Sequence, residues 1–173
     1  MSKLTALALS IAVLGGVWTF LAFGPLAGSV LVWAGFIAWG CYFHTGGDNA
    51  ALQKTIAGTV YGAIVAGIAL FLVVNNPVGL PAVAVAPVYV AVTVFFLVIV
   101  ASLNLLSVVP ANVYGYAATV AYALHQPTVD GVGPLASLTA VNFTNPVLLL
   151  SLSFVLGAVF GMVSGKVAGI LGK

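Results

Sequence analysis

The chain alternates long apolar runs with short breaks of glycine, proline and polar residues. Runs of this length predict helices, and the expected helices cover residues 4–23, 27–43, 55–74, 82–103, 109–125 and 146–166. The breaks are the segments 24–26, 44–54, 75–81, 104–108 and 126–145, which carry most of the turn-forming residues. The break before the fifth helix is the weakest, because only Ser102, Asn104, Ser107 and Pro110 interrupt the apolar run there.

The lengths of these runs match the thickness of a lipid bilayer. A hydrocarbon core of about 30 Å is crossed by about 20 helical residues. Runs such as Val88 to Val100 show none of the alternating polar positions of a membrane β-strand. We therefore expect an all-α polytopic membrane protein with six transmembrane helices in a single domain, residues 1–173.

Composition supports the same class. The chain is 63% hydrophobic and 3% charged, whereas a soluble domain has about 25% charged residues. A protein of 173 residues has too little interior to hide so much apolar surface from water. It has no arginine to hold phosphates and only four lysines, which argues against a nucleic-acid partner. The partner that the composition predicts is the lipid bilayer.

The lysines predict the orientation. Six crossings place both termini and the loops at 44–54 and 102–109 on one side of the membrane, and all four lysines fall on that side: Lys3, Lys54, Lys166 and Lys173. By the positive-inside rule that side is cytoplasmic, and the loops near Asn75 and Asp130 face outward. The first run is longer than a signal-peptide core and lacks a convincing cleavage site, so we treat it as a span.

Chemistry-bearing residues are scarce. The middle of each expected span lacks Asp, Glu, Lys and Arg, which disfavours proton-coupled or voltage-driven transport. The single Cys41 excludes an internal disulfide and a multi-cysteine metal site. The chain offers neither a nucleophile–base–acid set nor a phosphate-binding loop. We expect no enzymatic activity, no metal and no cofactor.

An internal repeat is suggested by a shift of 77 positions. This shift aligns Trp33-Ala34-Gly35-Phe36 with Pro110-Ala111-Asn112-Val113, and Trp39 with Tyr116. Small residues of the third helix, Gly58, Gly62 and Ala66, recur as Gly157, Gly161 and Gly165 in the sixth. Two tandem three-helix units, 1–76 and 77–173, would have opposite orientations, as in inverted-repeat transporters and channels. The alternative is a chance echo between segments rich in small residues.

Glycines form a ridge on the last helix. Gly157, Gly161, Gly165 and Gly169 recur at four-residue spacing, which allows another helix to approach closely. Within the chain, the expected partner is the third helix with Gly58 and Gly62. The alternative partner is a second copy of the chain, which would make the protein a homo-oligomer.

Two stripes are candidates for a solute path. At about 100° per residue, Trp33, Phe36, Gly40, Phe43 and His44 share one side of the second helix. The fifth helix carries Asn112, Gly115, Tyr116, Thr119 and Tyr122 in a similar stripe. Polar groups in this second stripe need protein or water partners, because lipid offers none. We predict that Trp33, Phe36, Phe43, Asn112, Tyr116 and Thr119 line the path; the alternative is that they fill the bundle or form an interfacial belt.

Two histidines end the second and fifth helices. The predicted topology places His44 and His125 at opposite membrane faces, where each is a candidate for one mouth of the path. Their alternative role is that of an interfacial residue or a partner of the helix C-terminal dipole. Residues at opposite faces cannot share a metal ion.

Two patches resemble a known family. Trp33-Ala34-Gly35-Phe36, Tyr42-Phe43 and Gly46-Gly47 form the first patch, and Leu106-Ser107-Val108-Val109-Pro110 with Gly115 and Ala118 forms the second. Both are similar to segments of the domain-of-unknown-function family 1097, a family of small bacterial inner-membrane proteins. The resemblance implies a multi-pass protein of the bacterial inner (cytoplasmic) membrane, and it implies no activity, cofactor or site residue.

Two functions follow as expectations. The first is a channel or facilitator for a small neutral or weakly polar solute, such as urea, a short amide or ammonia, with selectivity set by pore width and ring walls. The alternative is a structural or accessory membrane subunit that assembles through the glycine-rich face of the last helix.

Overall fold

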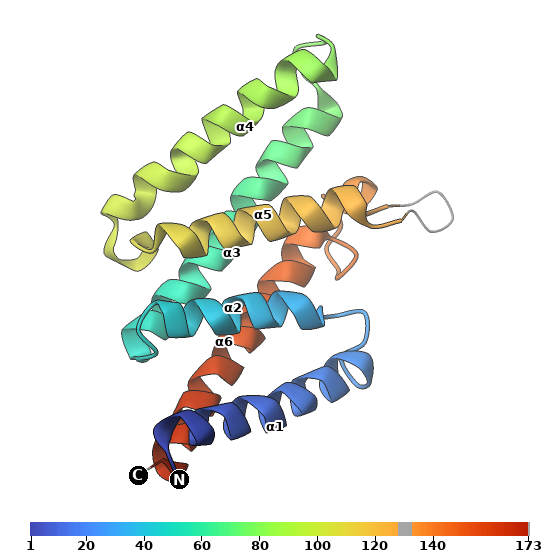
Figure 1. The fold of residues 1–173 in the computed structure, drawn as a ribbon. Helices are drawn as coiled ribbons and strands as arrows, with labels where there is room; N and C mark the ends of the chain where they lie inside the picture. The colour runs from blue at the N-terminus through green and yellow to red at the C-terminus, as the bar shows by residue number, and fades with distance from the viewer. Residues whose placement is uncertain (128–132, 173) are drawn as a thin grey trace.

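The structure is a computed structural model that describes residues 1–127 and 133–172 (Figure 1). These residues form six α-helices and no β-strand, in agreement with the expected all-α class. The helices are α1 (Lys3–Phe23), α2 (Val32–His44), α3 (Asn49–Asn75), α4 (Ala82–Ile99), α5 (Val109–His125) and α6 (Pro146–Leu171). Short 3₁₀ turns, Val100–Ser102, Asn104–Leu106 and Pro134–Ser137, lie between them. Asp130 and Lys173 lie outside the described residues.

Local side-chain chemistry explains where the helices begin. Helix α3 starts at Asn49, six residues earlier than expected, because the Asp48 carboxylate accepts a hydrogen bond from the backbone N–H of Ala51 at 2.7 Å. Helix α2 starts at Val32 rather than at residue 27. The segment before it turns at Gly28, which has φ 77°, and the Leu31 N–H donates to Ser153 Oγ of α6 at 2.9 Å.

Helix length divides the six helices into two groups. Helices α1, α3 and α6 and the segment Ala82–Ser102 around α4 are long and apolar enough to span a membrane. Helices α2 and α5 have 13 and 17 residues. At ~1.5 Å per residue they extend about 20 Å and about 26 Å, less than a hydrocarbon core of about 30 Å. The structure therefore shows six helices, four of them of membrane-spanning length.

The helices pack in a crossed arrangement. Helix α3 lies against α4 and α5, α6 lies against α1 and α2, and α3 and α6 contact each other between these two groups. A central core joins α2, α3, α5 and α6 through small and large apolar residues, among them Ala38, Ala63, Ala118 and Phe154. Two further cores lie on either side of it. One contains Val65, Leu97 and Tyr116 of α3, α4 and α5, and the other contains Trp18 and Trp39 of α1 and α2, packed against α6.

The glycine ridge of α6 packs within the chain, but its expected partner was wrong. A methyl group on Gly157 would lie 2.5 Å from the Cα of Gly35 in α2, and one on Gly161 would lie 3.1 Å from the Trp39 ring. Gly58 and Gly62 of α3 instead face α5, where a methyl group on Gly62 would lie 2.7 Å from the backbone nitrogen of Tyr116. Gly157 and Gly161 of α6 and Gly58 and Gly62 of α3 thus each pack on a short helix, where α2 and α5 approach closely enough to require the missing side chains.

The loops alternate between two ends of the bundle. In Figure 1 both termini, the turn between α2 and α3 and the turn between α4 and α5 lie on the left, and the other connections lie on the right. The surface between these ends is apolar, with side chains such as Leu4, Phe20, Val83 and Phe95 exposed. A surface of this kind is expected where lipid surrounds the helices.

Candidate functional site: a groove between the two short helices

An open groove of ≈ 720 Å³ runs between α2 and α5. Its α2 wall consists of Trp33, Phe36, Ile37, Gly40, Cys41 and His44, and its α5 wall of Tyr114, Ala117, Ala118 and Ala121. The α2 residues span almost the whole helix, from its first turn to its last. The groove therefore follows the α2 axis from one end to the other, and we call it the α2–α5 groove.

The predicted stripe of α2 lies largely in this groove. Trp33 and Phe36 are each 40% exposed there, and Gly40 has open space beside it. The rings of Phe36 and Trp39 are stacked, with centroids 5.4 Å apart, which holds Phe36 in place along the wall. Phe43 departs from the prediction, because it packs beside the buried core of α1 and α2 and lines a different pocket.

The polar stripe of α5 faces away from the groove. Asn112 and Thr119 are fully buried and Tyr116 is nearly so. The backbone of Thr59 in α3 lies directly against Gly115, in the middle of this stripe. The prediction that the two stripes face a common path was therefore wrong, since the polar face of α5 is occupied by α3 and α4 and a different face of α5 forms the groove.

Asn112 stabilises the weak break before α5. Its side-chain Nδ2 donates to the carbonyl oxygens of Leu97 at 3.2 Å and Leu106 at 3.1 Å. These carbonyls lie near the end of α4 and in the connection before α5. Its Oδ1 has no hydrogen-bond partner among the described residues. This oxygen lies against Gly58 of α3, since a methyl group on that glycine would be 2.8 Å away from it. Asn112 thus satisfies irregular backbone where lipid could not.

Tyr116 and Thr119 also find partners inside the protein. The Tyr116 hydroxyl lies 3.1 Å from Thr93 Oγ1 of α4. Thr119 Oγ1 donates to the carbonyl of Gly115 on its own helix at 2.8 Å. The polar stripe is therefore turned inward, as the chemistry of lipid requires, and its hydroxyl groups have partners on α4 and on α5 itself.

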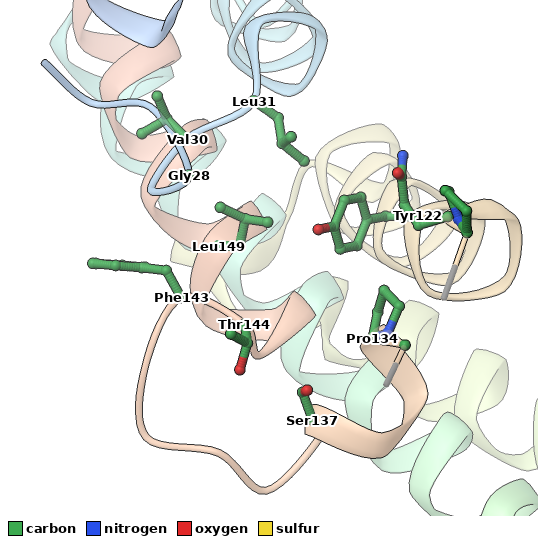
Figure 2. Close-up of a pocket in the computed structure, with 12 residues that line it drawn as sticks. Gly28, Val30, Leu31, Tyr122, Pro134, Ser137, Phe143, Thr144 and Leu149 are labelled. Carbon is green, nitrogen blue, oxygen red and sulfur yellow. The ribbon is translucent and has the colours of Figure 1, made fainter. Parts of the chain in front are cut away.

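A pocket of ≈ 420 Å³ lies at the α5 C-terminal end of the bundle (Figure 2). Figure 2 shows the ring of Tyr122 reaching from α5 toward Leu149 of α6, with Ser137 and Thr144 below it. Asn145 shapes the loop beside it, because its Nδ2 donates to the carbonyls of Leu138 and Ala140 at 2.9 and 3.0 Å. Leu31 and Tyr122 line this pocket, which we call the Tyr122 pocket.

The histidines occupy different environments at opposite ends of the helix pair. His44 is exposed and lines the α2–α5 groove. His125 is exposed at the end of α5, and its Nδ1 lies 3.2 Å from the carbonyl oxygen of Ala121. That carbonyl belongs to the last turn of the same helix, so His125 interacts with its own C-terminus.

Sequence reasoning missed the α5 wall of the groove. Tyr114, Ala117, Ala118 and Ala121 repeat at helical spacing, which is a signal for a common face. The polar stripe beside it is more conspicuous in the sequence. The small alanine side chains, however, are the ones that leave open space between α2 and α5.

Fold and surface define the class: an all-helical protein with several apolar helices of membrane-spanning length. Within that class, the chain belongs to the family described as "Protein of unknown function (DUF1097)", whose family model matches residues 8–169. The resemblance noted in the sequence is thereby confirmed. The search of curated proteins and the search of solved structures each found no match.

Proposed function

We propose that this protein is an integral membrane facilitator for a small neutral or weakly polar solute of the urea, amide or ammonia class, and that the solute follows the α2–α5 groove. The observation that carries the proposal is the groove itself. It follows α2 from Trp33 to His44, and its lining contains no Asp, Glu, Lys or Arg. Aromatic walls and a few hydrogen-bonding groups suit an uncharged solute of small cross-section.

The helix packing supports an inverted repeat as the frame of this path. Exchanging α1 with α4, α2 with α5 and α3 with α6 converts the α3–α5 contact into α6–α2 and the α3–α4 contact into α6–α1. The glycine contacts follow the same exchange, because Gly157 faces Gly35 as Gly58 faces Asn112. Repeats of this kind place a solute site where the halves meet, and here α2 and α5 meet along the groove.

In the proposed topology all six helices cross the membrane, and both termini are cytoplasmic. The alternation of the loops supports this topology. Lys3, Lys54 and Lys166 support it as well, because they lie near the start of α1, the start of α3 and the end of α6. The short helices α2 and α5 complete their crossings with the irregular segments beside them. Leu31 N–H bonded to Ser153 and the carbonyls bonded to Asn112 satisfy part of that backbone. The proposed location is the bacterial inner membrane, following the family resemblance.

A second copy of the chain closes the groove in this proposal. The groove is open on one side, and a polar solute would there face acyl chains that cannot hydrogen-bond to it. Tyr114, 38% exposed on the α5 wall, would lie close to that copy. The ridge residues Gly157 and Gly161 are buried against α2, so they do not supply the oligomer contact.

Solute permeability of proteoliposomes tests the proposed path. Gly40→Leu places a side chain in the groove, and, apart from its own helix, no atom of the described residues lies within 4 Å of the position its Cβ would take. We expect stopped-flow permeability to urea, acetamide or ammonia to fall to within about twofold of empty vesicles. The matched control is Gly16→Leu, on the exposed side of α1 with similarly open space, which should keep the wild-type rate. Equal permeability of wild-type and empty vesicles for all solutes would remove the proposal.

Cross-linking tests the closing copy. In a Cys41→Ser background, Tyr114→Cys should form a covalent dimer on mild oxidation, whereas Gly16→Cys should remain monomeric. A monomeric mass in mild detergent together with no Tyr114→Cys dimer in vesicles would exclude the second copy and leave the groove open to lipid.

A structural or accessory subunit is the second candidate function. The observation that favours it is the dry packing of Asn112 and Thr119, which act as contacts between helices and leave no polar surface to a solute. If no solute in the panel permeates and Gly40→Leu is silent, this role becomes the better description. In that role, the glycine-rich face of α6 would be free for assembly near Gly169, because Gly157 and Gly161 already pack against α2.

A further inference from the structure

A second pocket lies at the end of the bundle where the two chain termini meet. It has a volume of ≈ 630 Å³ and is formed by the start of α1, the turn between α2 and α3 and the last turns of α6. Helices α1 and α6 are in contact here, because a methyl group on Gly172 would lie 3.3 Å from the Cα of Lys3. Lys3 of α1 and Lys166 of α6 both line it, so we call it the Lys3–Lys166 pocket.

The charges in this pocket are unequal. Among the described residues, two lysines line it and both are exposed, whereas Asp48 is the one carboxylate side chain. The Oδ1 of Asp48 is engaged as the N-cap of α3, where it accepts the Ala51 N–H at 2.7 Å. Each lysine amine brings three donors and no acceptor. The pocket therefore has an excess of positive charge and of hydrogen-bond donors.

One part of the pocket lining is apolar. Leu7, Phe43, Gly165 and Gly169 form this part of the lining. Gly169 has open space beside it, and Gly165 faces the Phe43 ring at 3.5 Å from where its Cβ would be. The turn on the other side is held in shape by the Tyr42 hydroxyl, which donates to the Gly47 carbonyl. The pocket thus joins two cations to an apolar surface.

We propose that the Lys3–Lys166 pocket binds an anionic phospholipid, with the phosphate between the two lysines and an acyl chain along Leu7, Phe43 and Gly165. Both lysines lie close to the ends of apolar helices of membrane-spanning length, which places them at headgroup depth. Basic pockets between membrane helices are a recurrent site for anionic headgroups. The apolar wall favours a lipid over a soluble phosphate compound, and the proposal is independent of whether the α2–α5 groove conducts a solute.

Native mass spectrometry of the full chain in mild detergent tests this site. Phosphatidylglycerol and phosphatidylcholine with identical acyl chains are titrated, and glycerol phosphate serves as the soluble arm. We expect tighter binding of phosphatidylglycerol than of phosphatidylcholine, and a loss of about fivefold for each lysine changed to glutamine. The combined Lys3→Gln and Lys166→Gln variant should bind the two lipids equally, whereas Lys3→Arg with Lys166→Arg should keep the preference.

Two further variants test whether the lipid preference depends on this pocket. Lys54→Gln removes a half-buried lysine that does not line the pocket, and it should leave the preference unchanged. Gly169→Leu fills the apolar wall without a clash and should weaken phosphatidylglycerol binding while both lysines remain. Equal retention of both lipids by the wild type, or an equal loss in Lys54→Gln, would overturn the proposal. Glycerol phosphate binding as tightly as the lipid, with no effect of Gly169→Leu, would show a site for soluble phosphates instead.

Discussion

At the scale of single residues, Asn112 shows what a buried polar side chain does beside a break between two helices. Its amide is fully buried and bonds two backbone carbonyls that the broken helix leaves free. A hydroxyl such as that of Thr119 bonds a carbonyl that α5 already uses in its own ladder. Two buried polar residues on one stripe therefore differ in importance: one supports irregular backbone, and the other supports only itself.

This difference predicts unequal effects of substitution. Asn112→Leu leaves the carbonyls of Leu97 and Leu106 without the side-chain donor, and we expect a loss of about 1–3 kcal/mol in unfolding free energy. Thr119→Val removes one local bond at nearly constant volume and should change stability by less than about 0.5 kcal/mol. The measurement is the midpoint of unfolding on addition of dodecyl sulfate to protein in neutral detergent. Equal midpoints for the two variants would contradict this assignment.

At the scale of helices, close approach of backbones explains which elements meet. The α3–α5 and α6–α2 contacts both depend on glycines that face backbone atoms. Little hydrophobic force acts between helices in lipid, so contact along such ridges supplies much of the association energy. Glycines on the same helices with open space beside them carry no such constraint.

Two alanine substitutions on α6 distinguish a glycine that faces a neighbouring backbone from a glycine with open space beside it. Gly157→Ala places a methyl group 2.5 Å from the Cα of Gly35, so α2 must shift, at a cost of about 1–3 kcal/mol in stability. Gly169→Ala meets no atom within 4 Å, and higher helix propensity should leave stability unchanged or raise it by up to about 1 kcal/mol. Thermal unfolding in detergent measures both. A Gly157→Ala variant as stable as the Gly169→Ala variant would show that the α2–α6 contact is loose.

At the scale of the whole molecule, alternation of the loops predicts a topology that labelling can check. Five exposed positions lie on successive connections or at helix ends: Ala27, Ala50, Val78, Asn104 and Gln126. Changed singly to cysteine in a Cys41→Ala background, positions 50 and 104 should react with an impermeant maleimide only from the cytoplasmic side. Positions 27, 78 and 126 should react only from the outer side, because each intervening helix crosses the membrane.

The informative comparison concerns the short helices. If positions 27 and 50 react from the same side, α2 enters the membrane without crossing it, and the same reasoning applies to α5 with positions 104 and 126. Agreement at all five positions supports crossings by α2, α3, α4 and α5.

The sequence alone determined the helix content, the order of the breaks and the family. Apolar runs and turn residues act locally, so the predicted α1 and α5 match the observed helices within about one residue. Local effects also explain the misplaced starts, since the Asp48 cap extends α3 and the turn at Gly28 shortens α2. The sequence also required that Asn112, Tyr116 and Thr119 turn away from lipid, because hydrocarbon offers no hydrogen bonds.

Tertiary structure alone decided what those residues turn toward. A stripe on a helix identifies a buried face, but it does not say whether a neighbouring helix or an open groove lies against that face. The polar face of α5 packs against α3, the alanine face of α5 lines the groove, and the glycines of α6 pack against α2. These choices depend on how closely six helices can approach one another at the same time, which is a property of the whole packed molecule and of no single segment.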